Sequence, residues 1–295
     1  MSDFVLSCCS TADLSREFMR ERDISYVCFH FQLDGKEYLD DLGMSMDIGE
    51  FYRAMEAGAE TKTSQINADE FEQYFDGFLA QGKDILHVSL SSGISGVVNS
   101  ATIAKNSLEE KYPDRKIYIV DSLGASSGYG MIMSKLADMR DAGKSIDEVY
   151  EWIMNNRLRF HYWFFTSDLK YLVKGGRVNK AVGLVGSMLN ICPLLNISES
   201  GELVPRFKVR TKKKVLSTTL EQMEKYADNG TAYDDVCFIS HAYAKEDAEV
   251  LKEMVEGKFT ALKGKIKIFP IGTGIGAHTG PGTVALFFIG EPRKE

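Results

Sequence analysis

The segment SSGISG at residues 91–96 combines three serines with two glycines at the start of a run with helical spacing. It follows DILHVSL (residues 84–90), which is typical of a β-strand. Three kinds of chemistry fit such a segment: a loop that cradles a phosphate, a nucleophilic serine, or a site for another anion. The spacing of the neighbouring residues decides among them.

Nucleotide binding of the common types does not fit the spacing. GTGIG at residues 272–276 follows an expected strand, as a dinucleotide fingerprint does, but only seven residues separate Gly276 from Val284, where the next strand is expected. That interval leaves no room for the helix whose N-terminus would hold a pyrophosphate. The sequence also contains no G-x-x-x-x-G-K-[ST] loop.

A serine hydrolase stays open as an alternative. Gly93, Ser95 and Gly96 fall one residue short of the G-x-S-x-G nucleophile elbow. His278 is a candidate base and Asp121 follows a strand, and triads occur in several chain orders. For His241, behind the expected strand DVCFIS, a structural role is favoured. The alternative that stays open is therefore a serine hydrolase that acts through Ser95 and His278.

Anion capture fits all the features of SSGISG. The first N–H groups of a helix lack partners within the helix, and the helix dipole is positive there, so a carboxylate or phosphate is favoured. Glycine lets the backbone approach the anion, and serine hydroxyls add donors. A loop in which Ser92 or Ser95 merely caps the helix fits the composition equally well.

Composition narrows the classes of partner. The chain has 295 residues and a formal charge of −7, which argues against nucleic acid as the main partner. Five cysteines without C-x-x-C spacing indicate reduced thiols and no zinc site. Only five residues precede LSCC (residues 6–9), too few for the apolar core of a signal peptide. The apolar stretch 181–197 is interrupted and too short to span a bilayer, so we expect a cytoplasmic protein.

Alternating strand and helix patterns predict an α/β fold in two domains. FVLSCC, DILHVSL and KIYIVDS are typical of strands in the first half, and a new block begins near residue 160 with HYWFFTSDLKYL. We predict an N-terminal parallel-sheet α/β domain at 1–160 and a C-terminal α/β domain at 161–295. In the second half, helices are expected at 215–226 and 248–259, and strands at DVCFIS, KIKIFPIG and VALFFIG.

Three helix starts can be predicted in the first half. Asn67 and Ser145 each have a glutamate three residues later, which is the capping-box arrangement. Asp13 can cap a third helix. Four aromatic residues at helical spacing form one apolar face, for which core packing is favoured over a ligand site: Phe71, Tyr74, Phe75 and Phe78.

Several short motifs together resemble those of the DegV family of bacterial fatty-acid-binding proteins, which includes the lipid-carrying subunit of fatty acid kinase. CSTADL (residues 9–14) is similar to the family's D-S-T-x-D-L, TSQ (63–65) to T-S-Q-P, and SLSSGISG (89–96) to S-L-S-S-G-L-S-G-T. The order is completed by IVDS (119–122), YLVKGGRV (171–178) and AHTGPG (277–282). Each motif alone is weak, but their order along nearly the whole chain is specific.

The resemblance implies a two-domain α/β protein that holds one long-chain fatty acid between its domains, with no catalysis, metal or cofactor of its own. By the matching positions, Thr63, Ser95 and His278 hold the carboxylate. Residues of the same loops support them: Ser64, Ser92, Gly93, Gly96, Thr279 and Gly280. The apolar segment 183–195 is either a wall of the acyl tunnel or an ordinary core helix. The sequence does not fix the preferred chain length.

The resemblance also implies a partner, a separate kinase subunit that phosphorylates the bound carboxylate to an acyl phosphate for lipid synthesis. The matching docking positions are Arg177 and Arg210. Arg206, Lys208 and Arg210 alternate with apolar residues, so a strand would place three cations on one face. That face is either a surface for an acidic partner or an ordinary solvated face.

The sequence departs from the family pattern at three positions. Cys9 stands where the family usually has aspartate, Ile66 replaces the proline of T-S-Q-P, and Val97 replaces a threonine. The first change removes a charge from a strand end near the expected site, and the other two are expected to alter loop shape.

Overall fold

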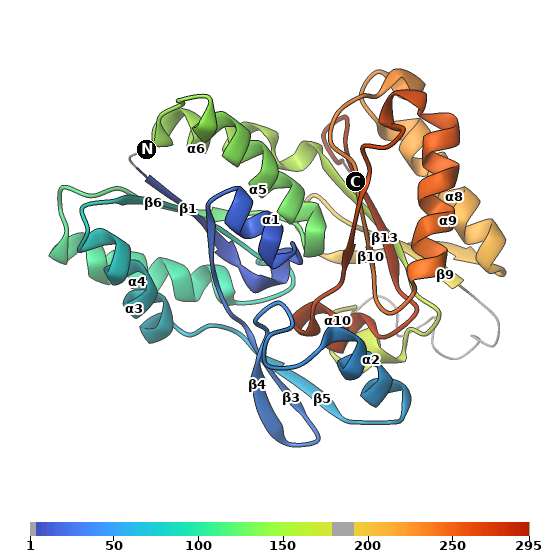
Figure 1. Ribbon diagram of the computed structural model, residues 1–295, viewed down its shortest axis with the longest axis horizontal. Helices are drawn as coiled ribbons and strands as arrows, with labels where there is room; N and C mark the ends of the chain where they lie inside the picture. The colour runs from blue at the N-terminus through green and yellow to red at the C-terminus, as the bar shows by residue number, and fades with distance from the viewer. Residues whose placement is uncertain (1–3, 179–191, 295) are drawn as a thin grey trace.

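A computed structural model describes residues 4–178 and 192–294, and its N-terminal part is built on an open parallel sheet (Figure 1). Its strands are β1 Phe4–Cys9, β2 Ile24–Val27, β6 Asp84–Ser89 and β7 Ile117–Asp121. The strand order is β2-β1-β6-β7, and every neighbouring pair is parallel. Strand β1 is buried along its whole length, as expected for a parallel sheet covered on both faces.

Helices cover both faces of this sheet, with α5 and α6 on one side and α3 and α4 on the other (Figure 1). The helices of this part are α1 Arg16–Glu21, α3 Ala68–Leu79, α4 Val97–Lys111, α5 Ser126–Asp141 and α6 Ile146–Asn156. Both predicted capping boxes are present, at Asn67 before α3 and Ser145 before α6. Of the predicted aromatic face, Phe71 and Phe75 are buried, and its other two members pack against the core.

Some expectations about helices were wrong. Ser15, not Asp13, caps α1 by accepting from the Phe18 N–H at 3.1 Å. The helix expected to start with SSGISG begins only after that loop, at Val97. A short helix is also present where none was expected. Helix α10 Thr273–Thr279 begins inside the GTGIG segment, directly after Gly272, and makes about two turns. Its shortness explains the error, because seven residues suffice for a helix that tertiary contacts stabilise.

A small antiparallel sheet lies between residues 30 and 64, and sequence patterns had not revealed it. It contains β3 His30–Leu33, β4 Lys36–Leu39 and β5 Thr61–Ser64, in the order β4-β3-β5. Helix α2 Ile48–Glu56 lies between β4 and β5 in the chain. Asp34 and Gly35 both have positive φ in the two-residue turn between β3 and β4. An Asp-Gly pair is a known hairpin signal, so this turn was predictable in principle.

The C-terminal part is built on a six-stranded mixed sheet (Figure 1). Its strands are β8 Phe160–Phe165, β9 Cys192–Ile197, β10 Leu203–Val209, β11 Phe238–His241, β12 Lys267–Pro270 and β13 Val284–Ile289. The order is β10-β9-β8-β13-β11-β12, and only the β11–β12 pair is parallel. Besides α10, the helices here are α7 Lys170–Lys174, α8 Lys212–Tyr226 and α9 Lys245–Lys258.

The predicted fold class, α/β with a parallel sheet followed by a second α/β part, is confirmed by this architecture. Strands of the parallel sheet end at Asp121, and strands of the mixed sheet begin at Phe160. The predicted domain boundary at residue 160 stays a prediction. Within the two described ranges, none of the helices combines the length and apolarity needed to cross a bilayer.

The SSGISG loop packs directly against the turn between β9 and β10. The Ser91 hydroxyl donates to the Gly201 carbonyl at 2.8 Å. A Cβ atom on Gly93 would lie 2.6 Å from the carbonyl carbon and oxygen of Gly201, closer than real Cβ contacts allow. Gly93 therefore lets the loop of one sheet touch the turn of the other.

Gly93→Ala tests this contact. We expect the substitution to lower the free energy of unfolding by about 1–3 kcal/mol, because a backbone neighbour cannot move aside as a flexible side chain can. Gly77→Ala is the matched control: it lies within α3, and nothing lies within 4 Å of its added Cβ. The control should raise stability by roughly 0.5–1 kcal/mol. Equal unfolding free energies for the two variants in chemical denaturation would contradict the close approach.

Candidate carboxylate-binding site

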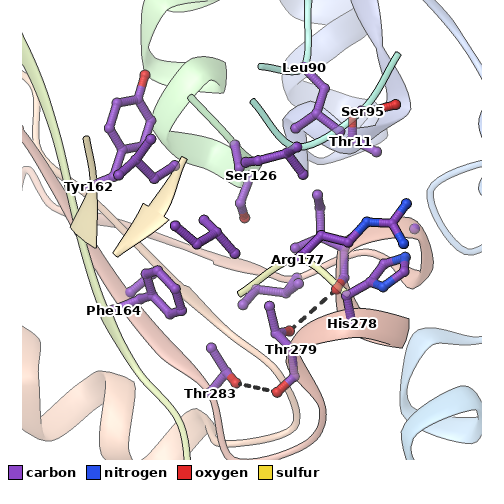
Figure 2. Close-up of a pocket in the computed structure, with 18 of the residues that line it drawn as sticks. Thr11, Leu90, Ser95, Ser126, Tyr162, Phe164, Arg177, His278, Thr279 and Thr283 are labelled. Carbon is purple, nitrogen blue, oxygen red and sulfur yellow. Dashed lines mark hydrogen bonds between the residues drawn. The ribbon is translucent and has the colours of Figure 1, made fainter. Parts of the chain in front are cut away.

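A cavity lies between the two large sheets, and side chains from both parts of the chain line it. Figure 2 shows Ser95, Arg177 and His278 at one end and Tyr162 and Phe164 at the other. The lining is polar at the first end and mostly apolar along the rest. Its shape and polarity suit an elongated apolar molecule with one polar end.

Thr63 and His278 form the central polar contact of the site. Thr63 lies on β5 and His278 near the end of α10, and Thr63 Oγ1 is 2.7 Å from His278 Nε2. The other ring nitrogen, His278 Nδ1, is buried and lacks a hydrogen-bond partner among the described residues. A Cβ atom on Gly175 would lie 2.3 Å from Nδ1, so only glycine leaves room for the ring there.

The imidazole of His278 is held in its neutral form. Burial, with a smaller contribution from the positive charge of Arg177, lowers its pKa from 6.5 to about 4. At neutral pH the ring therefore offers one N–H donor and one acceptor nitrogen. A bound carboxylate would find a donor here without a fixed charge on the ring.

Ser95 is held by Gln65 and not by a histidine. The Ser95 hydroxyl donates to Gln65 Oε1 at 3.0 Å, and the Val97 N–H donates to Ser95 Oγ at 3.3 Å. The Gln65 amide in turn donates to Ser100 Oγ at 3.1 Å. Ser95 thus sits in the turn just before α4, where the helix dipole favours an anion.

Arg177 lies at the polar end of the cavity, beside His278 in Figure 2. It follows Gly176, which has a φ of +68° at the end of α7, and its guanidinium donates to the Gly175 carbonyl. Burial lowers the pKa of this half-buried arginine from its ordinary value. Its predicted role in docking a partner stays a prediction, but its position places a positive charge within reach of a ligand's head group.

Arg210 lies one residue beyond the end of β10 and is exposed. The register of β10 against β9 shifts between Pro205 and Phe207, and this irregularity interrupts the expected alternation at Arg206. The three cations are therefore not on one regular strand face. Arg206 and Lys208 are nevertheless exposed at this edge of the mixed sheet.

The supporting residues divide between the cavity and its surroundings. Thr279 lines the cavity. Ser92 donates to Asp121 Oδ2 at 2.5 Å and, with Gly93 and Gly96, lines an adjoining groove. Ser64 follows Thr63 on β5, so its side chain leaves the opposite face of the strand.

Gly280 and Cys9 are closely packed, and neither is among the described residues that line the cavity. Gly280 has a φ of +74°, and an added Cβ would lie 2.1 Å from the Tyr171 ring. Cys9 is buried, its Sγ lies 3.6 Å from His87 Nε2, and burial raises the pKa of its thiol to about 12. The thiol is therefore uncharged where the family usually has aspartate.

Sequence reasoning missed several residues of the cavity. Gln65 belongs to the TSQ motif, but nothing in that motif indicates that its side chain contacts Ser95 in the SSGISG loop. Tyr162 and Phe164 alternate along β8 and share one face, so period-two spacing in HYWFFTS was the available signal. The predicted tunnel wall at 183–195 falls on residues 183–191, outside the described residues, and on 192–195, which belong to strand β9 rather than to a helix.

Comparison with known proteins identifies the family. The family model described as "Uncharacterised protein, DegV family COG1307" matches residues 9–291. A DegV domain-containing protein of Clostridium perfringens is 36% identical over 294 residues, which is 100% of both chains. This chain belongs to the DegV family.

Solved DegV structures share this fold. A Thermotoga maritima protein, whose structure was described as revealing a fatty acid binding function, has a TM-score of 0.83 and 28% identity, with 98% of this chain and 100% of that chain covered. The Streptococcus pneumoniae fatty acid kinase (Fak) B3 protein, loaded with linoleic acid, has a TM-score of 0.84 and 25% identity, with 99% and 100% coverage. The DegV resemblance read from the sequence motifs is therefore confirmed.

The hydrolase alternative is not supported. The Ser95 hydroxyl donates to Gln65, and the Nε2 atom of His278 is paired with Thr63, so the two expected members of a nucleophile–base pair are bonded to different partners. His241 accepts from the Ala244 N–H at 3.3 Å, which agrees with the structural role favoured for it.

The pKa of His278 provides a test of the site's electrostatics. We expect NMR titration to show that Arg177→Gln raises this pKa above about 4, because the substitution removes a nearby positive charge while leaving the burial. His161 is the control: burial also lowers its pKa to about 4, and the positive charge that acts on it is Arg293 and not Arg177, so its pKa should not change. An unchanged or lower pKa at His278 in the variant would contradict this picture.

Proposed function

We propose that this DegV protein binds one long-chain fatty acid in the cavity, with the carboxylate at Thr63, Ser95 and His278. The observation that carries the proposal is the arrangement of three polar side chains, from β5, the loop before α4 and α10, at one end of an apolar cavity. A carboxylate that leaves water needs several donors aimed at it. Two hydroxyls and a neutral imidazole supply them.

The acyl chain supplies most of the affinity. Burial of each methylene contributes about 0.8 kcal/mol, and the cavity wall toward Tyr162 and Phe164 is apolar. The fatty acid binding function described for the Thermotoga maritima protein and the linoleic acid in the Streptococcus pneumoniae protein support a ligand of this class. The protein acts as a carrier, and we place the chemistry on the carboxylate in a separate protein.

We further propose that the bound acid is presented to a kinase subunit that phosphorylates its carboxylate to an acyl phosphate. Support comes from the Streptococcus pneumoniae neighbour, which is named as a fatty acid kinase B3 protein. The polar end of the cavity adjoins an open groove lined by Ser92, Gly93 and Arg177, so a partner could reach the head group there. Arg210 lies on the exposed edge near β10 and would contact an acidic surface of the partner.

Fatty acid binding can be tested on the purified protein and on Thr63→Val. Denaturing extraction and mass spectrometry should find close to one fatty acid per chain, and added fatty acid should raise the melting temperature of delipidated protein. Thr63→Val keeps the side-chain shape but removes the hydroxyl, so it should weaken binding by about tenfold, the loss expected for one hydrogen bond to a charged group.

Thr61→Val is the matched control for this variant. Thr61 lies on the same face of β5 but donates to the Ala277 carbonyl at a long 3.4 Å. Its affinity for fatty acid should stay close to that of the unchanged protein. Absence of lipid from several preparations, together with no thermal stabilisation by added fatty acid, would refute the binding proposal.

The kinase proposal predicts a separation of functions at Arg210. Arg210→Glu should lower the rate of acyl phosphate formation with a cognate kinase by at least about tenfold, because a negative charge would then face the acidic surface of the partner. Fatty acid affinity should stay unchanged. Lys83→Glu, a charge reversal at an exposed position just before β6, is the control and should affect neither. Loss of lipid binding in Arg210→Glu would count against a docking role.

A further inference from the structure

Two buried carboxyl groups face the start of α10, the helix that carries His278. Asp13 follows β1 and Asp40 follows β4, and their exposed fractions are only 3% and 2%. A Cβ atom built on Gly272 would lie 2.7 Å from Asp13 Oδ1 and 3.2 Å from Asp40 Oδ1. Both carboxyl groups therefore converge on the residue that precedes the helix.

These carboxyl groups hold the residues at which α10 begins. Gly272, the N-cap residue, has no side chain and so cannot cap the helix itself. The Gly272 N–H donates to Asp13 Oδ1 at 3.0 Å, and the Thr273 hydroxyl donates to Asp40 Oδ1 at 2.7 Å. A helix of seven residues is not stable by itself, so these distant partners fix where it begins.

The same carboxyl groups are anchored on the N-terminal part of the chain. Asp40 Oδ2 accepts from the Ser10 hydroxyl at 2.8 Å, and that Ser10 oxygen also accepts from the Phe29 N–H at 3.0 Å. Asp13 Oδ2 accepts from the Ser126 hydroxyl at the start of α5. Each carboxyl group thus ties α10 to a fixed point on the parallel-sheet side of the cavity.

The ligand geometry depends on this tie because the ligand-binding groups come from both sides. Thr63 belongs to the small sheet and His278 to α10, and a 2.7 Å contact tolerates little displacement of the helix. We propose that Asp40, with Asp13, is a positioning residue for fatty acid binding: it sets the place of α10 and thereby the place of the His278 imidazole. This inference rests on the proposed function.

A double-mutant cycle on fatty acid affinity tests the positioning role. The four proteins are the unchanged chain, Asp40→Asn, His278→Gln and the double variant, each measured with oleic acid on delipidated protein. Asp40→Asn should weaken binding by about tenfold in the unchanged chain and by less than about twofold in the His278→Gln background, because both changes remove the same interaction. A role in overall stability alone would give the same factor in both backgrounds.

Asp41→Asn is the matched control. Asp41 is also buried, neighbours Asp40 in the chain and accepts from the Met44 and Ser45 N–H groups at 2.8 and 3.0 Å, a contact that does not involve α10. It should lower the melting temperature without changing fatty acid affinity. If Asp40→Asn does not fold, Thr273→Val takes its place in the cycle, since it removes only the hydroxyl that donates a hydrogen bond to Asp40.

The outcomes separate this inference from the proposed function. If His278→Gln leaves the affinity unchanged, the proposed carboxylate site is wrong and the positioning role falls with it. If His278→Gln weakens binding but the effect of Asp40→Asn is absent or is the same in both backgrounds, the positioning role alone is overturned. A loss at Asp40→Asn that disappears in the His278→Gln background supports it.

Discussion

The contact between Thr63 and His278 is the constraint on which the rest of the site depends. A strand of the small sheet provides one partner and a short helix after β12 provides the other, and 215 positions separate them in sequence. Their 2.7 Å approach requires the parallel sheet, the small sheet and the mixed sheet to be held in one arrangement. Glycines at 175, 201 and 280 allow this close packing, because a side chain at any of them would collide with His278, Ser91 or Tyr171, respectively.

The electrostatic character of the site follows from its burial. The cavity lowers the pKa of His278 and raises that of the buried Asp13 and Asp40, so burial disfavours the charged form of each group. Arg177 is the cation at the polar end of the cavity, and it is only half-buried. A carboxylate bound as we propose would meet neutral donors inside and a positive charge toward the groove, and this arrangement would orient its head group outward and its chain inward.

Local sequence signals predicted the elements that local physics determines. The capping boxes at Asn67 and Ser145 and the strand–helix alternation of the first half are set by nearby residues, and the structure contains them. The capping boxes depend on contacts within a few positions in the chain. The loop residues that line the cavity were predicted in another way, from the resemblance to the DegV family.

Features that depend on distant partners were not predictable in the same way. The spacing leaves no room for a helix after GTGIG, yet carboxyl groups more than 200 positions away hold the residues at which α10 begins. Asp13 looks like a helix cap in sequence, but its acceptor oxygens are used by Gly272 and Ser126 instead. Gln65 has no local signal for its bond to Ser95, since the loops meet only in the folded chain.

The pairing of Ser95 with Gln65 explains how a serine in such a loop can bind without reacting. A carboxylate that takes the Ser95 hydroxyl replaces its bond to Gln65, and a hydrogen bond to such a charged acceptor contributes only about 1.5–3 kcal/mol. By contrast, roughly fifteen buried methylenes contribute on the order of 12 kcal/mol before the costs of ordering the chain. For the proposed ligand, affinity would therefore depend on the apolar wall, and the polar residues would fix which end of the ligand faces the groove. With no base bonded to its hydroxyl, Ser95 has the geometry of a hydrogen-bond donor and not of a nucleophile.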